Sequence, residues 1–159
     1  MARSLFAGLL CVCVLALGAC GGGDGSGSAH DIPGGADPDD VRVIDDWART
    51  LREGDIDGAA RYFAIPSVAE NGPTLIQIRD REDARLFNAS LPCGAELVRA
   101  VPEGDFVVAT FELTERPGPG SCGSGTGAAA QTAFVIEDGR IVEWRRVGAG
   151  GEEAPSSSV

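Results

Sequence analysis

The chain has 159 residues, of which 24 are acidic and 13 basic, so its formal net charge at pH 7 is −11. Every basic residue is an arginine, and the arginines are scattered along the chain. Nucleic acid is therefore not expected as a partner, because its recognition depends on a concentrated basic surface. An anionic membrane surface would also repel the protein, so any attachment to a membrane needs another source.

The first segment, residues 1–19, has the pattern of an export signal. Arg3 provides a positive charge, and an apolar run follows from Leu5 to Leu17. The run has the length of the apolar region of a signal peptide and is shorter than the roughly 20 residues that cross a bilayer. The segment ends in Leu17-Gly18-Ala19-Cys20. A leucine and two small residues before a cysteine resemble the lipobox of bacterial lipoproteins.

This resemblance implies a lipid anchor on Cys20. In bacterial lipoproteins the equivalent cysteine receives a diacylglyceryl group and becomes the first residue of the mature chain. Two acyl chains hold a protein stably on a membrane, at ~0.8 kcal/mol per buried methylene. The expected location is therefore the outer, extracytoplasmic face of the cell membrane. The alternative is an ordinary cleaved signal peptide with a chance cysteine.

Three regions are expected after the signal. Residues 20–36, rich in Gly, Ser and Asp, predict a flexible tether, and its histidine, His30, is expected to be solvated. Residues 37–147 suit one domain of ordinary size. Residues 148–159 again combine small and polar residues and predict a disordered tail.

The first half of the domain predicts three helices and a short hairpin. One helix begins at Pro38 and ends at Gly54, and others are expected over 56–63 and 81–90, each preceded by an aspartate that can cap it. The hairpin is centred on Asn71-Gly72-Pro73. Apolar residues form one stripe along the first helix: Val41, Ile44, Trp47, Ala48 and Leu51.

The second half predicts four antiparallel strands. Two are expected over 95–101 and 106–115, and two in a hairpin over 132–147, whose Asp138-Gly139 turn is the strongest short-range hairpin signal. The fold class is therefore α+β, a curved antiparallel sheet wrapped around the N-terminal helices in a cone. A two-residue turn predicts the pairs Glu137–Arg140, Ile136–Ile141, Val135–Val142, Phe134–Glu143, Ala133–Trp144, Thr132–Arg145 and Gln131–Arg146.

Two local strings, LREGDIDGAARYFA and VIEDGRIVEWRRV, resemble the SnoaL-like, nuclear transport factor 2-like superfamily. The resemblance covers about residues 39–147. In that superfamily the curved sheet and the long helix enclose a pocket, which serves enzymes, ligand binders and dimerisation modules alike. A homodimer is thus one expectation, and the fold by itself does not settle the function.

Catalysis by this domain has only weak candidate residues. Isomerases, dehydratases and cyclases of the superfamily use Asp, His or Tyr groups in an apolar pocket, where burial tunes the pKa. The domain has no histidine, so a His–Asp pair is ruled out. Tyr62, Glu112 and Glu143 are the weak candidates, and no catalytic residue is assigned. Tyr62 is better explained as a core residue with its hydroxyl at the rim. Cross-strand pairing with Arg99, Arg145 or Arg146 explains the two glutamates equally well.

The aromatic residues predict a pocket. Trp47, Tyr62, Phe63 and Phe87 are expected to converge on the curved sheet, whereas Trp144 is expected to be structural. No metal and no cofactor are expected. The predicted function is an extracytoplasmic, lipid-anchored protein that binds a small apolar ligand or a protein partner without catalysis. A small-molecule isomerase, dehydratase or cyclase is the alternative.

Two cysteines fall within the domain, Cys93 and Cys122, both near expected strand ends. An exported protein can keep a disulfide, so the two are expected to be bonded. The crosslink would stabilise the domain by about 3.5 kcal/mol on the chain-entropy model. Two free thiols or a metal pair are the alternatives.

Overall fold

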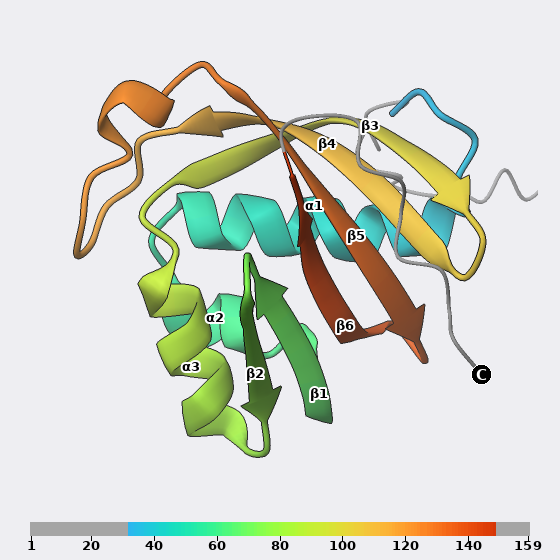
Figure 1. Cartoon of the computed structure of the whole chain (residues 1–159), viewed down its shortest axis with the longest axis horizontal. Helices are drawn as coiled ribbons and strands as arrows, with labels where there is room; N and C mark the ends of the chain where they lie inside the picture. Colours follow the sequence, from blue (N-terminus) through green and yellow to red (C-terminus); the bar gives the residue numbers. More distant parts are fainter. Residues whose placement is uncertain (1–31, 149–159) are drawn as a thin grey trace, which may run out of the picture.

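The structure is a computed structural model that describes residues 32–148. The predicted signal over 1–19, the proposed lipid site Cys20 and the tail beyond residue 148 lie outside the described residues. In the described part, helices pack against a curved six-stranded sheet (Figure 1). None of the helices described is long and apolar enough to cross a membrane.

The three helices are α1 (Pro38–Arg52), α2 (Ile56–Ala60) and α3 (Arg81–Ser90). An aspartate caps each of them by accepting a backbone N–H bond in the first turn, as predicted. The second helix is shorter than the expected range of 56–63. Phe63 instead begins a strand, because the backbone of Tyr62 and Phe63 joins the last strand of the sheet, with Ile141 N donating to Tyr62 O at 2.8 Å.

The sheet has the order β2-β1-β6-β5-β4-β3 and is not closed. All neighbouring strands are antiparallel except β1 and β6, which are parallel, so the sheet is mixed and the prediction of a fully antiparallel sheet was wrong on this point. The α+β cone is confirmed. The strands are β1 (Phe63–Asn71), β2 (Thr74–Ile78), β3 (Gly94–Glu103), β4 (Phe106–Thr114), β5 (Ala129–Glu137) and β6 (Arg140–Val147).

The hairpin of β5 and β6 contains a bulge that the sequence analysis missed. Glu137 pairs with Arg140 and Ile136 with Ile141 as predicted, but Val142 is then an extra residue in β6. The reason is that Ile141 and Trp144 are both buried in the core cluster on one face, and a strict period of two cannot place residues three apart on the same face. The other predicted pairs are therefore wrong, and the observed ones are Val135–Glu143, Phe134–Trp144, Ala133–Arg145, Thr132–Arg146 and Gln131–Val147.

The main core lies between α1 and the concave face of the sheet (Figure 1). Its centre is Trp47 of α1, whose indole ring meets aromatic rings of the sheet edge-on, at centroid distances of 5.6 Å to Phe134 and 6.5 Å to Trp144. The indole N–H of Trp47 donates to the buried Oδ1 of Asn88 at 2.9 Å. This bond ties α1 to α3 and satisfies two polar groups that burial would otherwise penalise.

The chain just before α1 is also packed against the domain. Ile32 and Ala36 contact the main core, and Pro33 O accepts a hydrogen bond from Ala100 N of β3 at 3.0 Å. Gly34 sits so close to this strand that an added Cβ would lie 1.9 Å from Ala100 O. The last residues of the expected tether, 32–36, are therefore part of the folded unit.

Candidate functional site

The structure contains an apolar cavity of about 220 Å³ between α1 and the inner face of the sheet. Trp47 and Leu51 of α1 form one wall, and inward-facing side chains of β3 to β6 form the other. The segment after α3 and the loop before β5 close one end. The lining residues are Trp47, Leu51, Leu91, Pro92, Cys93, Ala95, Phe111, Leu113, Gly125, Ala130, Gln131, Thr132, Trp144 and Arg146.

Four polar side chains accompany this apolar lining, all on β5 and β6: Gln131, Thr132, Trp144 and Arg146. Gln131 is exposed, and its amide N–H donates to the Thr110 hydroxyl at 3.3 Å. The Trp144 side chain is buried, and its indole N–H has no hydrogen-bond partner among the described residues. Thr132 is also buried on the wall, directly opposite Arg146 in the pairing of the two strands. Arg146 is exposed, and its guanidinium group is the one charge on the lining. The described lining contains no Asp, Glu, His or Tyr, so no residue that could act as a general acid or base near neutral pH faces the cavity.

The structure separates the four residues expected to form the pocket. Trp47 lines the cavity, but Phe63 and Phe87 are buried in the core and do not. Tyr62 lies in a separate shallow depression, which also includes Arg61 and Asp55. The prediction that these four residues line one pocket was therefore wrong for all but Trp47. Phe63 starts β1 and packs against Trp47 of α1 and Phe87 of α3, so it is covered by these helices and does not face the cavity.

The two glutamates considered as catalytic candidates do not line the cavity. Glu112 is exposed and paired in register with Glu96 and Ala129. Glu143 is half-buried next to the β6 bulge and forms an ion pair with Arg145 of the same strand. The expected arginine partner is therefore present for Glu143, although the pair lies along the strand rather than across it.

The cavity wall includes both Trp144 and Arg146. The sequence had predicted a structural role for Trp144 and a role as partner of a glutamate for Arg146. Sequence reasoning missed these assignments because it carried an unbroken register past Ile141. The spacing of Ile141 and Trp144, two large apolar residues three apart in a strand, was the available signal of a bulge. With the bulge, Trp144 and Arg146 share the inner face with Phe134 and Thr132.

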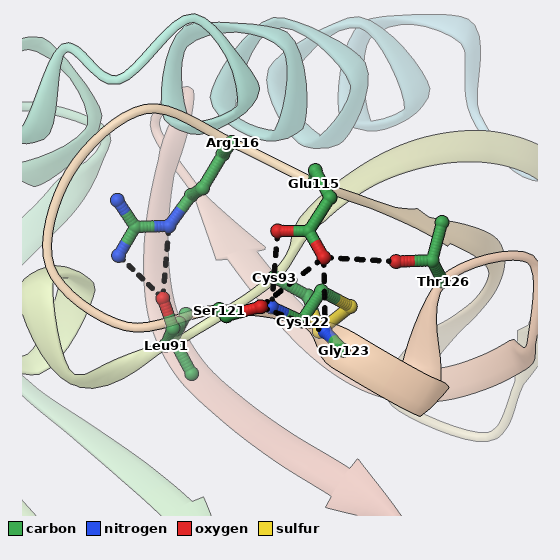
Figure 2. Close-up of a disulfide and its surroundings, with 8 residues drawn as sticks. All are labelled: Leu91, Cys93, Glu115, Arg116, Ser121, Cys122, Gly123 and Thr126. Carbon is green, nitrogen blue, oxygen red and sulfur yellow. Dashed lines mark hydrogen bonds between the residues drawn. A yellow bond between two sulfur atoms is a disulfide. The ribbon is translucent and has the colours of Figure 1, made fainter.

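The predicted disulfide between Cys93 and Cys122 is present (Figure 2), and it lies beside the cavity, whose lining includes Cys93. It fastens the start of β3 to the loop before β5. Gly125 packs beside it, since an added Cβ would lie 3.2 Å from the Cys122 sulfur and 3.6 Å from the Cys93 sulfur. The crosslink therefore supports one wall of the cavity directly.

The carboxylate of Glu115 organises the same loop (Figure 2). It accepts backbone N–H bonds from Cys122 at 3.2 Å and Gly123 at 2.9 Å, and side-chain O–H bonds from Thr126 and Ser121. The backbone bond from Cys122, followed by that from Gly123, lowers the pKa of the Glu115 carboxyl below its usual value. The ionised carboxylate thus holds the loop in the position where Gly125 can line the cavity.

The next residue, Arg116, is buried and attaches the loop to the end of α3 (Figure 2). Its guanidinium donates to the carbonyl oxygens of Leu91, Ala89 and Pro117, with an Nε–O distance of 2.9 Å to Leu91. The first two of these carbonyls lie at the C-terminal end of the helix, where a positive charge is favoured. Burial lowers the pKa of the Arg116 guanidinium from its usual value.

Metal binding has no support in the part of the chain that the structure describes. Residues 32–148 include no group of three or more His, Cys, Asp or Glu placed to hold a metal ion. Cys93 and Cys122, which were considered as a metal pair, are bonded to each other. The G-x-G-x-x-G string at 118–123 lies in the loop before β5 and is followed there by a short 3₁₀ turn and a strand, so it does not form a dinucleotide site.

An α+β cone with an apolar cavity under the long helix defines a class of proteins with a nuclear transport factor 2-like fold. The model of the SnoaL-like domain family matches residues 44–144, and the chain belongs to this family. The resemblance of the two local strings to that superfamily is thereby confirmed. A search of curated protein sequences found no match.

Solved structures show the same fold at low sequence identity. The chain is similar to a proposed polyketide cyclase from Sinorhizobium meliloti, with 19% identity, a TM-score of 0.52, and 67% of this chain and 94% of that chain covered. It is also similar to a proposed ketosteroid isomerase from Kribbella flavida, at 16% identity, TM-score 0.52 and coverage of 74% and 82%. A nuclear transport factor 2-like protein of unknown function from Cytophaga hutchinsonii gives 11% identity, TM-score 0.53 and coverage of 68% and 88%.

Proposed function

We propose that this protein is a lipid-anchored binding protein of the cell envelope, whose SnoaL-like domain takes up a small apolar molecule without transforming it. The observation that carries the proposal is the cavity under α1, with a largely apolar lining and four polar side chains confined to β5 and β6. Ligand sites typically combine such an apolar lining with a few placed polar groups. The cavity is smaller than the usual 300–1,000 Å³ of drug-sized sites, so the molecule must be small.

The absence of catalysis is inferred from the lining. A cyclase or isomerase needs a group that accepts or donates a proton at the substrate, within roughly 2.6–3.2 Å of the reacting atom. On the described lining the titratable candidate is the guanidinium of Arg146, which stays protonated and cannot act as a base. Tyr62, Glu112 and Glu143 lie away from the cavity. The names of the two proposed enzymes among the similar structures therefore do not carry over to this chain.

The anchoring part of the proposal rests on Leu17-Gly18-Ala19-Cys20 at the end of the apolar run. Two acyl chains on Cys20 would hold the domain at the outer face of the cell membrane, with residues 21–31 as a glycine-rich connection to the folded unit. A disulfide in the domain suits this location, because extracytoplasmic compartments are oxidising. The net charge of −11 leaves no basic patch to serve as an alternative attachment.

The binding function can be tested with the protein's own fluorophores. The chain contains two tryptophans, Trp47 and Trp144, and both line the cavity, so a ligand that enters should change their fluorescence. We expect saturable changes with 3-phenylpropan-1-ol or 3-phenylpropanoate. We also expect native mass spectrometry to show one bound molecule per subunit.

A matched pair of variants ties that signal to the cavity. Ala130→Phe places a bulky ring on the cavity wall and should abolish the response. Ala129→Phe makes the same change at the neighbouring exposed position on the other face of β5 and should leave it intact. The binding proposal fails if neither probe gives a saturable response at millimolar concentration, or if both variants respond like the original protein.

The anchor is tested separately by Cys20→Ser. This variant cannot form the thioether to the lipid, so the protein should move from the membrane fraction to the soluble or secreted fraction. The control is Cys13→Ser, which changes a cysteine inside the expected signal peptide and should leave the protein in the membrane. If Cys20→Ser stays in the washed membrane fraction with normal processing, the lipid anchor is refuted while the binding proposal stands.

A further inference from the structure

Arg146 is unusual among the arginines of the described chain because its guanidinium has no partner. Most of the others form ion pairs or donate to carbonyl oxygens, and within residues 32–148 only Arg61 and Arg99 share this lack of a side-chain partner. Arg99 is exposed on β3, and Arg61 borders the shallow depression near Tyr62. Arg146 is thus the unpaired cation that lines the apolar cavity.

The bulge in β6 puts Arg146 in this position. It turns Trp144 and Arg146 to the inner face, so the guanidinium stands at the exposed rim while the indole lies deeper on the same strand. Thr132 is the strand partner of Arg146, and the structure shows no hydrogen bond to its hydroxyl within the described chain. The buried indole N–H of Trp144 also lacks a partner there. One wall of a largely apolar cavity therefore carries three donor groups without a partner in the described chain, whereas the fourth polar group, the Gln131 amide, already donates to Thr110.

We propose that the ligand is a monocarboxylic acid with an apolar body, and that Arg146 binds its carboxylate. This inference rests on the proposed binding function. A guanidinium group suits a carboxylate because it presents two parallel N–H donors to the two oxygens. The body of the acid lies between Trp47, Phe111 and Trp144, whose rings line the cavity. In a protein of net charge −11, an unpaired cation at a cavity rim supplies the local attraction for an anion.

The volume limits the size of the acid. The cavity has a volume of about 220 Å³. A dry cavity of about 150 Å³ binds benzene, so this one has room for one ring with a short acid side chain, or for a short alkyl chain. Long-chain fatty acids and steroids are too large to be enclosed completely by this cavity. The ligand class is therefore an aryl-alkanoate or a short-chain to medium-chain alkanoate.

The test compares an acid with its neutral analogue. In titrations followed by tryptophan fluorescence and checked by isothermal calorimetry, 3-phenylpropanoate should bind about tenfold more tightly than 3-phenylpropan-1-ol at low salt. Arg146→Gln should remove this preference by weakening the acid about tenfold, and it should leave the affinity for the alcohol unchanged. Arg99→Gln makes the same charge change at an exposed site outside the cavity and should preserve the preference. The preference should also fall as salt is raised.

The possible results separate this inference from the proposed function. If acid and alcohol bind equally well and Arg146→Gln changes neither, the cavity binds apolar molecules but the acid specificity is refuted. If both arginine variants weaken the acid equally, the effect comes from net charge, and the role of Arg146 is also refuted. If neither probe binds the original protein, the proposed function fails and this inference fails with it.

Discussion

Replacing Arg116 by leucine should be among the most destabilising single changes in this protein. Arg116 is 7% exposed, and its guanidinium donates to three carbonyl oxygens, those of Leu91, Ala89 and Pro117. A hydrogen bond to a charged donor contributes about 1.5–3 kcal/mol, and a buried carbonyl left without a donor costs about 1–3 kcal/mol. Leucine removes the cost of burying the charge but leaves these carbonyls without a partner. We therefore expect a loss of about 3 kcal/mol in the free energy of unfolding.

The assay is equilibrium unfolding in urea, with the free energy extrapolated to water. Arg42→Leu is the control, because Arg42 forms an exposed ion pair with Asp39 on α1 and its loss should cost less than about 1 kcal/mol. Arg116→Lys should fall between the two, since it keeps the charge but not the forked geometry. A loss below about 1 kcal/mol for Arg116→Leu would show that water satisfies these carbonyls. The role of Arg116 as the attachment of the loop to α3 would then be refuted.

Three further predictions concern the crosslink, the aromatic residues and the loop carboxylate. The double variant Cys93→Ser/Cys122→Ser should lose about 3.5 kcal/mol and about 10–20 °C in Tm, and two alkylatable thiols in the native, non-reduced protein would contradict the bond itself. Trp144→Ala should cost about 3–5 kcal/mol as a large core truncation, whereas Tyr62→Phe should stay within about 1 kcal/mol; equal losses in urea unfolding would refute this contrast. The pKa of Glu115 is lower in the folded state than the usual 4.5. The ionised Glu115 carboxylate therefore stabilises the fold fully above about pH 4.5, and this stabilisation is lost as the pH falls through the folded-state pKa. Glu115→Gln should therefore flatten the fall of Tm between about pH 5 and pH 2, and equal slopes for the two proteins would rule this out.

The elements that could be predicted from the sequence are those with local signals. Aspartate caps and apolar spacing placed α1 and α3, and the Asp138-Gly139 turn placed the last hairpin, because a cap or a tight turn depends on residues within a few positions of each other. The two domain cysteines predicted the disulfide for a similar reason, since a single pair has a single way to connect. The family also followed from short strings that resemble the SnoaL-like domain.

Features that depend on contacts between residues far apart in the chain could not be predicted in this way. The parallel pairing of β1 with β6 ended α2 early and buried Phe63, which removed it from the expected pocket. The bulge at Val142 turned Trp144 and Arg146 toward the cavity, because the inner face must hold both Ile141 and Trp144 in one packed core. A shift of one residue in a strand exchanges its two faces, so the register of β6 fixed which side chains line the site. The spacing of Ile141 and Trp144 signals that a bulge is needed, but the packing of β6 against α1 and β5 decides where the bulge falls.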